Sequence, residues 1–362
     1  MKMYDPFKER LHSIVAEHRG KNNLVKSLSS DGNSIGSFDP VSRRLIKEQR
    51  SFSSNMQLQA QPLGSVLKPE VLNNAKLGLH PDFTELKGTD NIAYHYIVSA
   101  FIDIQGSTNL HRKYDLIDIY RITNTIQSAA IHTVITMGGH VQRLQGDGVF
   151  AYFGGKNIDK KKANELAVMA SSMFTYFVEN DLKSLFLTDG IEDINTRIGI
   201  DFGDDNDVLW ANFGLLAVSE LTTNSLHTSL ASKMQQWATR NGIVVGQHVK
   251  DRLLIADTFF DLVRNSKGEV EKRYIFEIPD ENFRYTQYKF EWLKYLKSLP
   301  FIQVRPDGTL LIVDAAEQQR IERLRNNVNA AATGNSFLNP LGQIANNPSG
   351  VRHEPHRFHH GK

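Results

Sequence analysis

Two stretches of the chain, Phe101-Ile102-Asp103-Ile104-Gln105-Gly106-Ser107-Thr108 and Arg143-Leu144-Gln145-Gly146-Asp147-Gly148, each place one aspartate near a glycine in a short apolar setting. Two carboxylates brought together in this way can hold a pair of Mg²⁺ ions against a triphosphate, because Mg²⁺ binds a few carboxylate oxygens together with water and phosphate oxygens. The pattern therefore favours phosphoryl-type chemistry on a nucleotide. The alternative is that each aspartate only caps a turn at the end of a strand.

The apolar periodicity around these stretches predicts an α+β domain. Residues 96–104 indicate a buried strand, residues 116–135 a helix that glycines 138 and 139 end, and residues 141–144 and 149–153 a hairpin with Asp147 at its turn. A helix over residues 161–177 and a strand over residues 197–202 follow. This β-α-β-β-α-β order is typical of ferredoxin-like folds, and neighbouring strands would bring Asp103 and Asp147 to one end of the sheet.

Two further motifs follow in order, Asn195-Thr196-Arg197-Ile198-Gly199-Ile200-Asp201-Phe202-Gly203 and Ser229-Leu230-Ala231-Ser232-Lys233-Met234. Together the four motifs resemble those of the class III nucleotidyl cyclases, the adenylyl and guanylyl cyclase homology domain. The resemblance runs from Tyr94 to about Ile278. It implies a ferredoxin-like catalytic domain that works as a head-to-tail homodimer, with active sites shared across the interface.

The resemblance assigns roles to residues of this chain. Asp103 and Asp147, joined by the Ile104 carbonyl, would ligate two Mg²⁺ or Mn²⁺ ions. Arg197 would contact phosphate, and the alternative is a salt bridge at the end of its strand. Phosphate oxygens would also be cradled by the backbone amides of the segment before the next helical stretch, formed by Gln105, Gly106, Ser107 and Thr108.

Catalytic members of the family mostly carry asparagine and arginine where this chain has Ser229 and Lys233, four residues apart on one helix face. Serine can still hydrogen-bond the ribose and lysine still supplies positive charge, but the planar fork of arginine is lost. Lys250 and Arg252 are alternative phosphate contacts, with solvated surface positions as the other interpretation. The non-catalytic alternative for Ser229 and Lys233 is an ordinary amphipathic helix.

Base recognition is where the chain departs most from the family. Arg143 stands where adenylyl cyclases carry lysine and guanylyl cyclases glutamate, and Thr222 takes the partner position seven residues before Ser229. An arginine with a small hydroxyl partner resembles the pyrimidine cyclases of the Pycsar anti-phage systems, which make cyclic UMP or cyclic CMP as a signal.

Hydrogen-bonding chemistry then orders the two pyrimidines. Arg143 can donate to uracil O4 while Thr222 accepts from N3–H, whereas the amino group of cytosine would face a cation without a lone pair. We therefore expect UTP to be preferred, with cyclic CMP or cyclic AMP synthesis as the enzymatic alternatives. The non-enzymatic alternative is a degenerate cyclase dimer that only senses nucleotides, which the presence of both Asp103 and Asp147 disfavours.

Composition agrees with a globular enzyme. The chain has 362 residues with 40% hydrophobic content, enough for one sizeable core, and no cysteine, which excludes a disulfide framework and thiolate metal sites. A net charge of +2 gives no general attraction to nucleic acid or to anionic lipid. Without an apolar run of membrane-spanning length or a signal-peptide pattern, we expect a cytoplasmic location. The resemblance to the Pycsar cyclases implies a product that a separate cyclic-nucleotide-responsive effector reads.

Four segments are expected along the chain. Residues 1–90 form an N-terminal arm, partly helical or disordered, with a short helix over 7–15, and residues 91–281 form the catalytic domain. Residues 282–325 form an extension with a helix over 283–299 and a hairpin over 301–313. Residues 326–362 form a disordered tail whose histidines would bind metal only incidentally, these being His353, His356, His359 and His360.

Overall fold

The computed structural model describes residues 1–25, 77–191, 194–265, 267–281 and 283–313, together with residue 323 and two short strands. The chain divides into two units, Met1–Ile312 and Val313–Lys362, and the second contains the paired strands β14 (Ser336–Leu338) and β15 (Ile344–Asn346). The four tail histidines and the part of the N-terminal arm between residues 26 and 76 lie outside the described residues.

The centre of the first unit has the predicted β-α-β-β-α-β order. It comprises β2 (Ile97–Gln105), α3 (Leu116–Thr136), β3 (His140–Gln145), β4 (Gly148–Phe153), α4 (Lys160–Tyr176) and β5 (Asn195–Gly203). The four strands lie in the sheet in the order β5-β2-β4-β3, and all neighbouring pairs among them are antiparallel. The α+β, ferredoxin-like prediction is therefore confirmed.

Beyond β5 the sheet continues with strands that come later in the chain. β8 (Gly242–Gly246) pairs in parallel with β5, and β11 (Phe283–Phe290) joins β8 to β10 (Ile275–Ile278) and to the short β9 (Phe260–Asp261). The helix predicted over residues 283–299 is wrong in its first half, because only α8 (Trp292–Ser298) is helical. Tyr285 and Phe290 belong to core clusters on opposite faces of the sheet. The spacing of the aromatic residues in the sequence does not distinguish such a strand, buried on both faces, from a helix.

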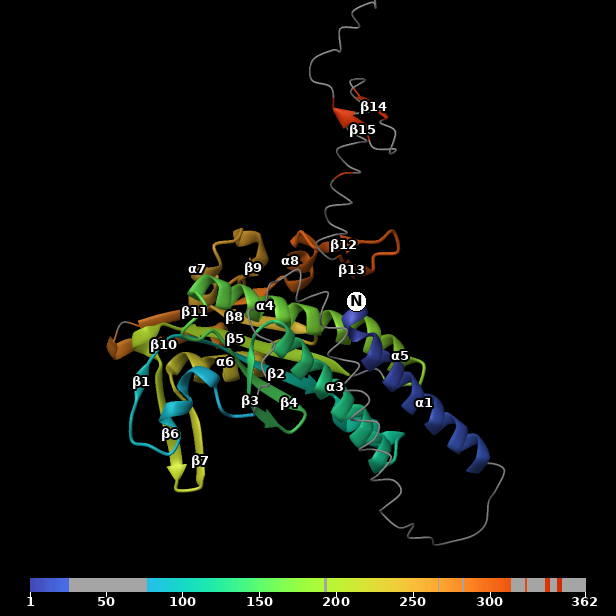
Figure 1. The fold of residues 1–362 in the computed structure, drawn as a ribbon, viewed down its shortest axis with the longest axis horizontal. Coiled ribbons are helices and arrows are strands. Elements are labelled where there is room, and N and C mark those ends of the chain that lie inside the picture. The colour runs from blue at the N-terminus through green and yellow to red at the C-terminus, as the bar shows by residue number, and fades with distance from the viewer. Residues whose placement is uncertain are drawn as a thin grey trace, which may run out of the picture. The chain divides into compact units, whose positions relative to one another are not determined.

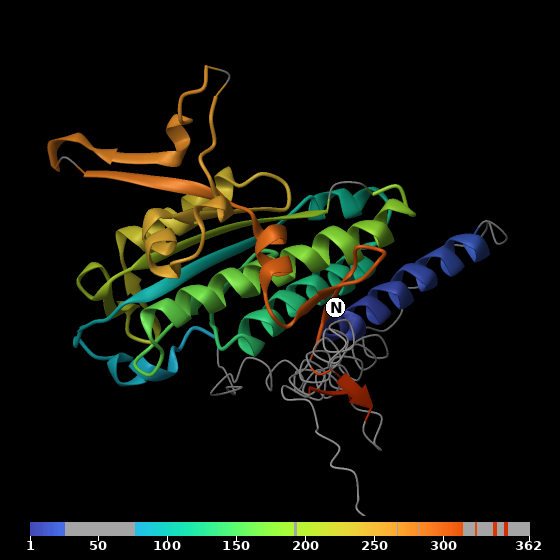
Figure 2. The ribbon, with the colours of Figure 1, turned by 90° about the horizontal axis from the view of Figure 1, so that it is seen from above.

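One face of the sheet is covered by α3 and α4, which lie side by side, and by α1 (Asp5–Val25) along α3 (Figures 1 and 2). The residue before α1, Tyr4, anchors this end of the helix: its ring stacks on Phe177, and its hydroxyl lies 2.8 Å from that of Thr133 in a hydrogen bond. α1 is longer than the predicted helix over residues 7–15. The π-helical η4 (Phe177–Leu182) and α5 (Lys183–Leu187) continue the chain after α4.

The opposite face carries α6 (Leu226–Trp237), which packs on β5, β2 and β8. The packing is close because Gly199 has no side chain: a Cβ there would lie 2.1 Å from the Ala231 carbonyl oxygen. A smaller sheet of β1 (Ala93–Tyr94), β6 (Leu209–Leu215) and β7 (Val218–Asn224) adjoins this face and buries Trp210 against Phe83. In Figure 1 the β6–β7 hairpin extends away from the main sheet.

The remaining elements are short. α7 (Gln247–Leu253) follows β8, and the predicted hairpin around residues 306–308 is present as β12 (Ile302–Val304) and β13 (Leu310–Ile312). Short 3₁₀-helices occur at η1 (Lys2–Tyr4), η2 (Pro81–Leu86), η3 (Ser107–Arg112), η5 (Asp205–Asp207), η6 (Asp257–Phe259), η7 (Lys272–Tyr274) and η8 (Pro279–Glu281). Within the described part of the chain, every helix is too short or too polar to cross a bilayer.

Candidate active site

Asp103 and the Asp147 turn lie at the same end of neighbouring strands. Asp103 is near the end of β2, and Asp147 lies in the tight connection between β3 and β4, where Gly146 adopts a φ of 62°. β4 begins directly beside Asp103, since a Cβ on Gly148 would lie 3.0 Å from the Ile102 carbonyl oxygen and 3.9 Å from the Asp103 Cα. The sheet thus brings the two acids to one edge, and the side chains of both are partly exposed.

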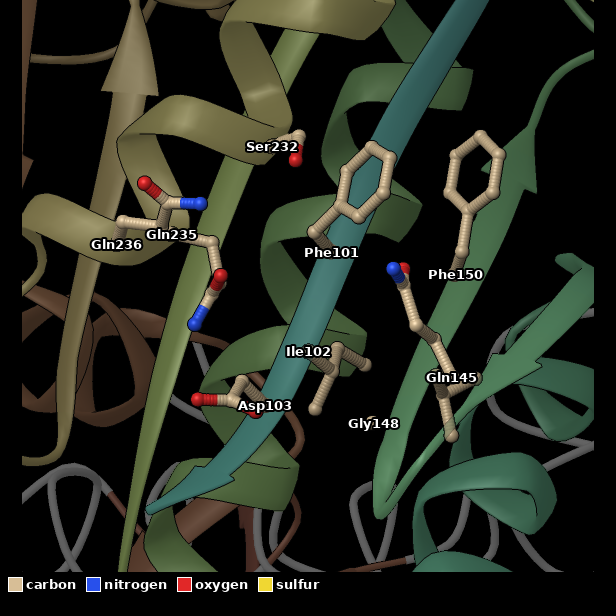
Figure 3. Close-up of a pocket in the computed structure, with 10 residues that line it drawn as sticks. Phe101, Ile102, Asp103, Gln145, Gly148, Phe150, Ser232, Gln235 and Gln236 are labelled. Atoms are coloured by element: carbon tan, nitrogen blue, oxygen red, sulfur yellow. The ribbon is translucent and has the colours of Figure 1, made fainter.

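A pocket of about 220 Å³ opens beside Asp103 on the α6 face. Figure 3 shows Asp103 of β2 near the glutamines of α6 and Gly148 of β4 beside Gln145, with the rings of Phe101 and Phe150 next to each other. The lining residues come from β2, the β3–β4 hairpin and α6, namely Phe101, Ile102, Asp103, Gln145, Gly148, Val149, Phe150, Ser232, Gln235 and Gln236.

Three of these lining residues, Ser232, Gln235 and Gln236, were missed by sequence reasoning. They follow Ser229 at helical spacing, so the same helical pattern that paired Ser229 with Lys233 could have included them.

Arg197 faces Asp103 directly. The two residues are paired across β5 and β2, and the Arg197 Nη2 lies 2.8 Å from the Asp103 Oδ2. A second, weaker contact of 3.4 Å joins Arg197 to the Gln236 carbonyl oxygen. The salt bridge that was the alternative for Arg197 is therefore formed, and it keeps a positive charge next to the carboxylate in this state.

The segment after Asp103 makes a tight turn into η3. Gly106 has a φ of 88°, a left-handed conformation that glycine adopts without strain, and Ser107 begins the 3₁₀-helix. The first amides of such a helix have no carbonyl partner within it. The side-chain amide oxygen of Gln105 is buried without a hydrogen-bond partner. Polar groups therefore lie at the end of β2 and directly after it, on Gln105, Gly106, Ser107 and Thr108.

Arg143 of β3 and Thr222 of β7 lie where side chains of the main sheet contact the small sheet. Arg143 forms an ion pair with Glu220, in which the Nε lies 3.2 Å from Glu220 Oε1. Gln142 donates to the same oxygen and to the Leu221 carbonyl, both at 2.8 Å. The Thr222 hydroxyl is 3.2 Å from the hydroxyl of Tyr152.

Glu220 is a residue that sequence reasoning missed. It stands two positions before Thr222 on the same strand, so strand periodicity puts the two on one face. The two-residue spacing from Thr222 was therefore the sequence feature that could have placed Glu220 beside the predicted base-binding residues.

Ser229 and Lys233 lie on exposed turns of α6, and neither is among the residues that line the Asp103 pocket of their own chain. The Ser229 hydroxyl donates to the Ser225 carbonyl at 3.2 Å, and the Lys233 ammonium lies 5.7 Å from the centre of the Phe276 ring. Lys250 and Arg252 are engaged elsewhere, in ion pairs with Asp257 and Asp204.

Comparison with known proteins finds relatives in sequence and in fold. No family model matches the chain. The chain is 41% identical over 228 residues to a cytidylate cyclase of Staphylococcus aureus, and this alignment covers 62% of this chain and 53% of that protein. It is 34% identical over 240 residues to a cytidylate cyclase of Escherichia coli, and this alignment covers 64% of this chain and 52% of that protein. The chain thus spans about half the length of these curated relatives.

Among solved structures, the adenylyl cyclase CyaB from P. aeruginosa aligns with 55% of this chain and 95% of its own, at 17% identity and a TM-score of 0.45. The four ordered motifs resemble those of the class III nucleotidyl cyclases, and the chain is similar in sequence to two curated cytidylate cyclases.

Proposed function

We propose that this chain cyclises a pyrimidine nucleoside triphosphate, with CTP ahead of UTP, and releases pyrophosphate. The observation that carries the proposal is the pocket in which Asp103 lies beside the Asp147 turn. In this reaction the ribose 3′-hydroxyl loses its proton and attacks the α-phosphorus of the same nucleotide, and the bond between the α-phosphorus and the pyrophosphate oxygen breaks.

The residues present fit divalent metal ions. Asp103 and Asp147 offer hard carboxylate oxygens that are partly open to solvent, and Asp103 already faces the cationic Arg197. Asp103, Asp147 and the Ile104 carbonyl would hold Mg²⁺ or Mn²⁺, which supplies neutralising charge for the triphosphate. Arg197, released from Asp103, would then donate to phosphate oxygens together with the amides of residues 106–108.

The Arg143–Glu220 pair changes the base prediction. The preference for UTP assumed that Arg143 offers donors alone, so that the cytosine amine would meet no acceptor. Glu220 supplies that acceptor, because its carboxylate can accept from cytosine N4–H while Arg143 donates to N3. The same pair can also accept from uracil N3–H and donate to O4, so the argument against cytosine no longer holds.

Similarity to proteins named cytidylate cyclase then supports CTP as the first candidate. UTP remains the second, because the Arg143–Glu220 pair is compatible with both bases. On the resemblance to the Pycsar cyclases, we extend the proposal to a cyclic pyrimidine nucleotide that signals in antiviral defence and is read by a separate effector.

A homodimer with shared sites is the assembly we propose. The pocket of about 220 Å³ is smaller than the roughly 300–1,000 Å³ of ordinary ligand sites, as expected for half of a composite site. The tip of the β6–β7 hairpin exposes apolar side chains, with Leu215 at 73%, Leu216 at 87% and Val218 at 85%. Burial against a second copy would remove this apolar surface from water.

The decisive test is product identity. The purified chain is incubated with an equimolar mixture of ATP, GTP, CTP and UTP in Mg²⁺ or Mn²⁺, and the products are identified by mass spectrometry. Cyclic CMP as the main product is expected. Mainly cyclic UMP would restore the base order predicted from the sequence, mainly cyclic AMP would overturn the pyrimidine assignment, and no cyclic product would contradict the enzymatic function.

Shared sites are tested by mixing two inactive variants. In the proposed dimer Asp103 serves one chain's half-site and Lys233 serves its partner's, so Asp103→Ala and Lys233→Ala proteins should each be inactive. Mixed dimers retain one intact site, and we expect up to about one quarter of the wild-type rate after subunit exchange. Mixtures that exchange subunits and stay as inactive as each parent would exclude the shared-site arrangement.

A further inference from the structure

Three side chains of metal-ligand type meet at the end of β5 that is remote from Asp103. They are Asp207 of η5, His227 in the first turn of α6 and His248 in the first turn of α7, and one ligand atom from each lies within 4.8 Å of the others. β5 passes Asp103 at Arg197 and reaches this cluster four residues later, at Asp201, which is roughly 13 Å along a strand. The cluster is therefore separate from the paired acids.

Both imidazole rings are oriented by hydrogen bonds at Nδ1. The His227 Nδ1 lies 2.9 Å from Asp201 Oδ2, and the His248 Nδ1 lies 3.2 Å from the Phe202 carbonyl oxygen. Because the partners are acceptors, each Nδ1 carries the hydrogen, and in the neutral ring, the form that binds metals, each Nε2 has a lone pair. The His227 Nε2 is 3.9 Å from Asp207 Oδ2, so a small cation fits between these two groups.

Asp201 has the features of a residue that positions a metal-binding histidine. Its side chain is fully buried, and besides His227 it accepts from the Tyr285 hydroxyl at 2.5 Å and from the Phe202 amide at 2.9 Å. A carboxylate that fixes the outer nitrogen of a histidine is a recurrent feature of protein metal sites, where it sets the tautomer and raises the basicity of the ligand.

Two glycines allow the elements to converge on this cluster. A Cβ on Gly246 would lie 2.0 Å from Asp201 Oδ1, and a Cβ on Gly203 would lie 3.1 Å from the Ser225 hydroxyl and 3.5 Å from the His227 Cβ. Side chains at either position would push α7 or α6 away from β5. The arrangement thus depends on close backbone approach from both helices.

We propose that Asp207, His227 and His248 form a zinc-type divalent metal site that fixes the N-terminal turn of α6. Two imidazole nitrogens and one carboxylate suit Zn²⁺ or Co²⁺, whereas Mg²⁺ prefers an all-oxygen set. The two proposed metal sites therefore differ in ligand chemistry as well as in position. Since α6 also carries Ser229 and Lys233, the bound ion would hold the helix that presents these residues.

Cobalt absorption tests this site without any activity measurement. The full chain, carrying alanine at His353, His356, His359 and His360 to remove tail binding, is treated with a chelator and titrated with Co²⁺. We expect one equivalent to give visible absorption bands of a low-coordinate cobalt site, and Zn²⁺ but not excess Mg²⁺ to abolish them. Saturation without such bands, or bands that excess Mg²⁺ removes, would overturn the proposal.

Matched variants locate the ion. His248→Ala and Asp207→Asn should each weaken Co²⁺ binding on the order of tenfold or more, while Asp103→Asn should leave it unchanged. Zn²⁺ should raise the melting temperature of the parent but not that of Asp207→Asn, whose exposed position makes misfolding easy to exclude by circular dichroism. Cobalt binding that persists unchanged in both Asp207→Asn and His248→Ala would contradict the assignment. Cyclase activity does not enter this test, so a failure of the proposed reaction would leave its result intact.

Discussion

At the scale of single residues, Asp103 combines an ion pair with Arg197 and a proposed role as a metal ligand. In this structure its carboxylate is 2.8 Å from the Arg197 guanidinium, with both side chains about one quarter exposed. Catalysis as proposed requires that carboxylate to face metal ions and Arg197 to face phosphate. On this proposal the Asp103–Arg197 ion pair is present in the resting protein. Binding of substrate and metal ions would replace it with stronger charge-assisted contacts, from Asp103 to metal and from Arg197 to phosphate.

Neutralising either acid should remove activity while the fold persists. We expect Asp103→Asn and Asp147→Asn to lower the rate of cyclisation by on the order of 100-fold or more, because each removes a charge that the reacting phosphates depend on. Turnover of CTP and UTP by each purified variant is the measurement, and circular dichroism checks the fold.

The matched control for these acids is Asp257→Ala, which removes an exposed carboxylate paired with Lys250. It should keep full activity. A well-folded Asp147→Asn protein with near wild-type turnover would contradict the role of the paired acids.

Glu220 should influence base selectivity. Glu220→Ala removes the acceptor of the cytosine amine, whereas uracil N3–H can still donate to the Thr222 hydroxyl while uracil O4 accepts from Arg143. We expect the ratio of CTP to UTP turnover to fall about tenfold, since an unsatisfied buried donor costs about 1–3 kcal/mol.

Glu85→Ala is the control for Glu220, because Glu85 is a glutamate that also forms an ion pair, with Lys156 at 2.9 Å. It should leave the CTP to UTP ratio unchanged. Equal ratios in wild type and Glu220→Ala would exclude Glu220 from base recognition.

At the scale of elements, the position of α6 is set by its contact with β5. The Gly199 position approaches the Ala231 carbonyl and the Gln235 amide so closely that a Cβ would lie 2.1 and 2.3 Å from them. Backbone atoms on both sides leave no flexible side chain to move aside. The helix that carries Ser229, Lys233 and three pocket glutamine or serine residues is thus held at a fixed distance from Asp103.

Gly199→Ala should displace this helix. We expect it to lower the free energy of unfolding by about 1–3 kcal/mol and to reduce turnover with either pyrimidine triphosphate, because overpacking shifts the backbone. Gly20→Ala is the opposite control, since Gly20 lies within α1 with open space around it and alanine favours helix by about 1 kcal/mol. Denaturant unfolding measures both, and a stabilised Gly199→Ala protein would contradict the close packing.

At the scale of the whole molecule, three histidines are buried in the neutral form. Burial lowers the pKa of His80 to about 3, and it lowers the pKa values of His132 and His140 to about 4. His140 and His80 lie next to each other with ring centres 5.2 Å apart, whereas His132 contacts Phe7 of α1. The folded state therefore takes up protons at these sites only at low pH.

The chain should lose stability in acid because of these histidines. Below the ordinary pKa of about 6.5 the unfolded chain binds protons that the folded chain does not, so the free energy of unfolding falls by up to about 1.4 kcal/mol per pH unit for each histidine. The fall should continue until the pH reaches the lowered values near 4 and 3. Denaturant unfolding at several pH values between 7.5 and 4 measures the slope.

His132→Phe isolates one of the three contributions. Phenylalanine fills the same space beside Phe7 and does not titrate, so the slope below pH 6.5 should decrease. An unchanged slope in this variant would show that His132 is not buried as a neutral group.

The sequence by itself determined the central β-α-β-β-α-β order and the position of both acids. Strand and helix periodicity around Asp103 and Asp147 reflects local burial, which each segment encodes in its own residues. For the same reason the predicted bounds of β2, α3, β3, β4, α4 and β5 agree with the structure to within two residues.

Only the tertiary structure decided which residues face one another. β11 is a strand because β8 and β10 flank it, although its aromatic residues also fit helical spacing. Glu220 meets Arg143, and Asp207 meets His227 and His248, through pairings between segments distant in the chain. Such contacts depend on long-range packing that no local pattern contains, so the proposed base partner and the proposed second metal site could be recognised only in the folded chain.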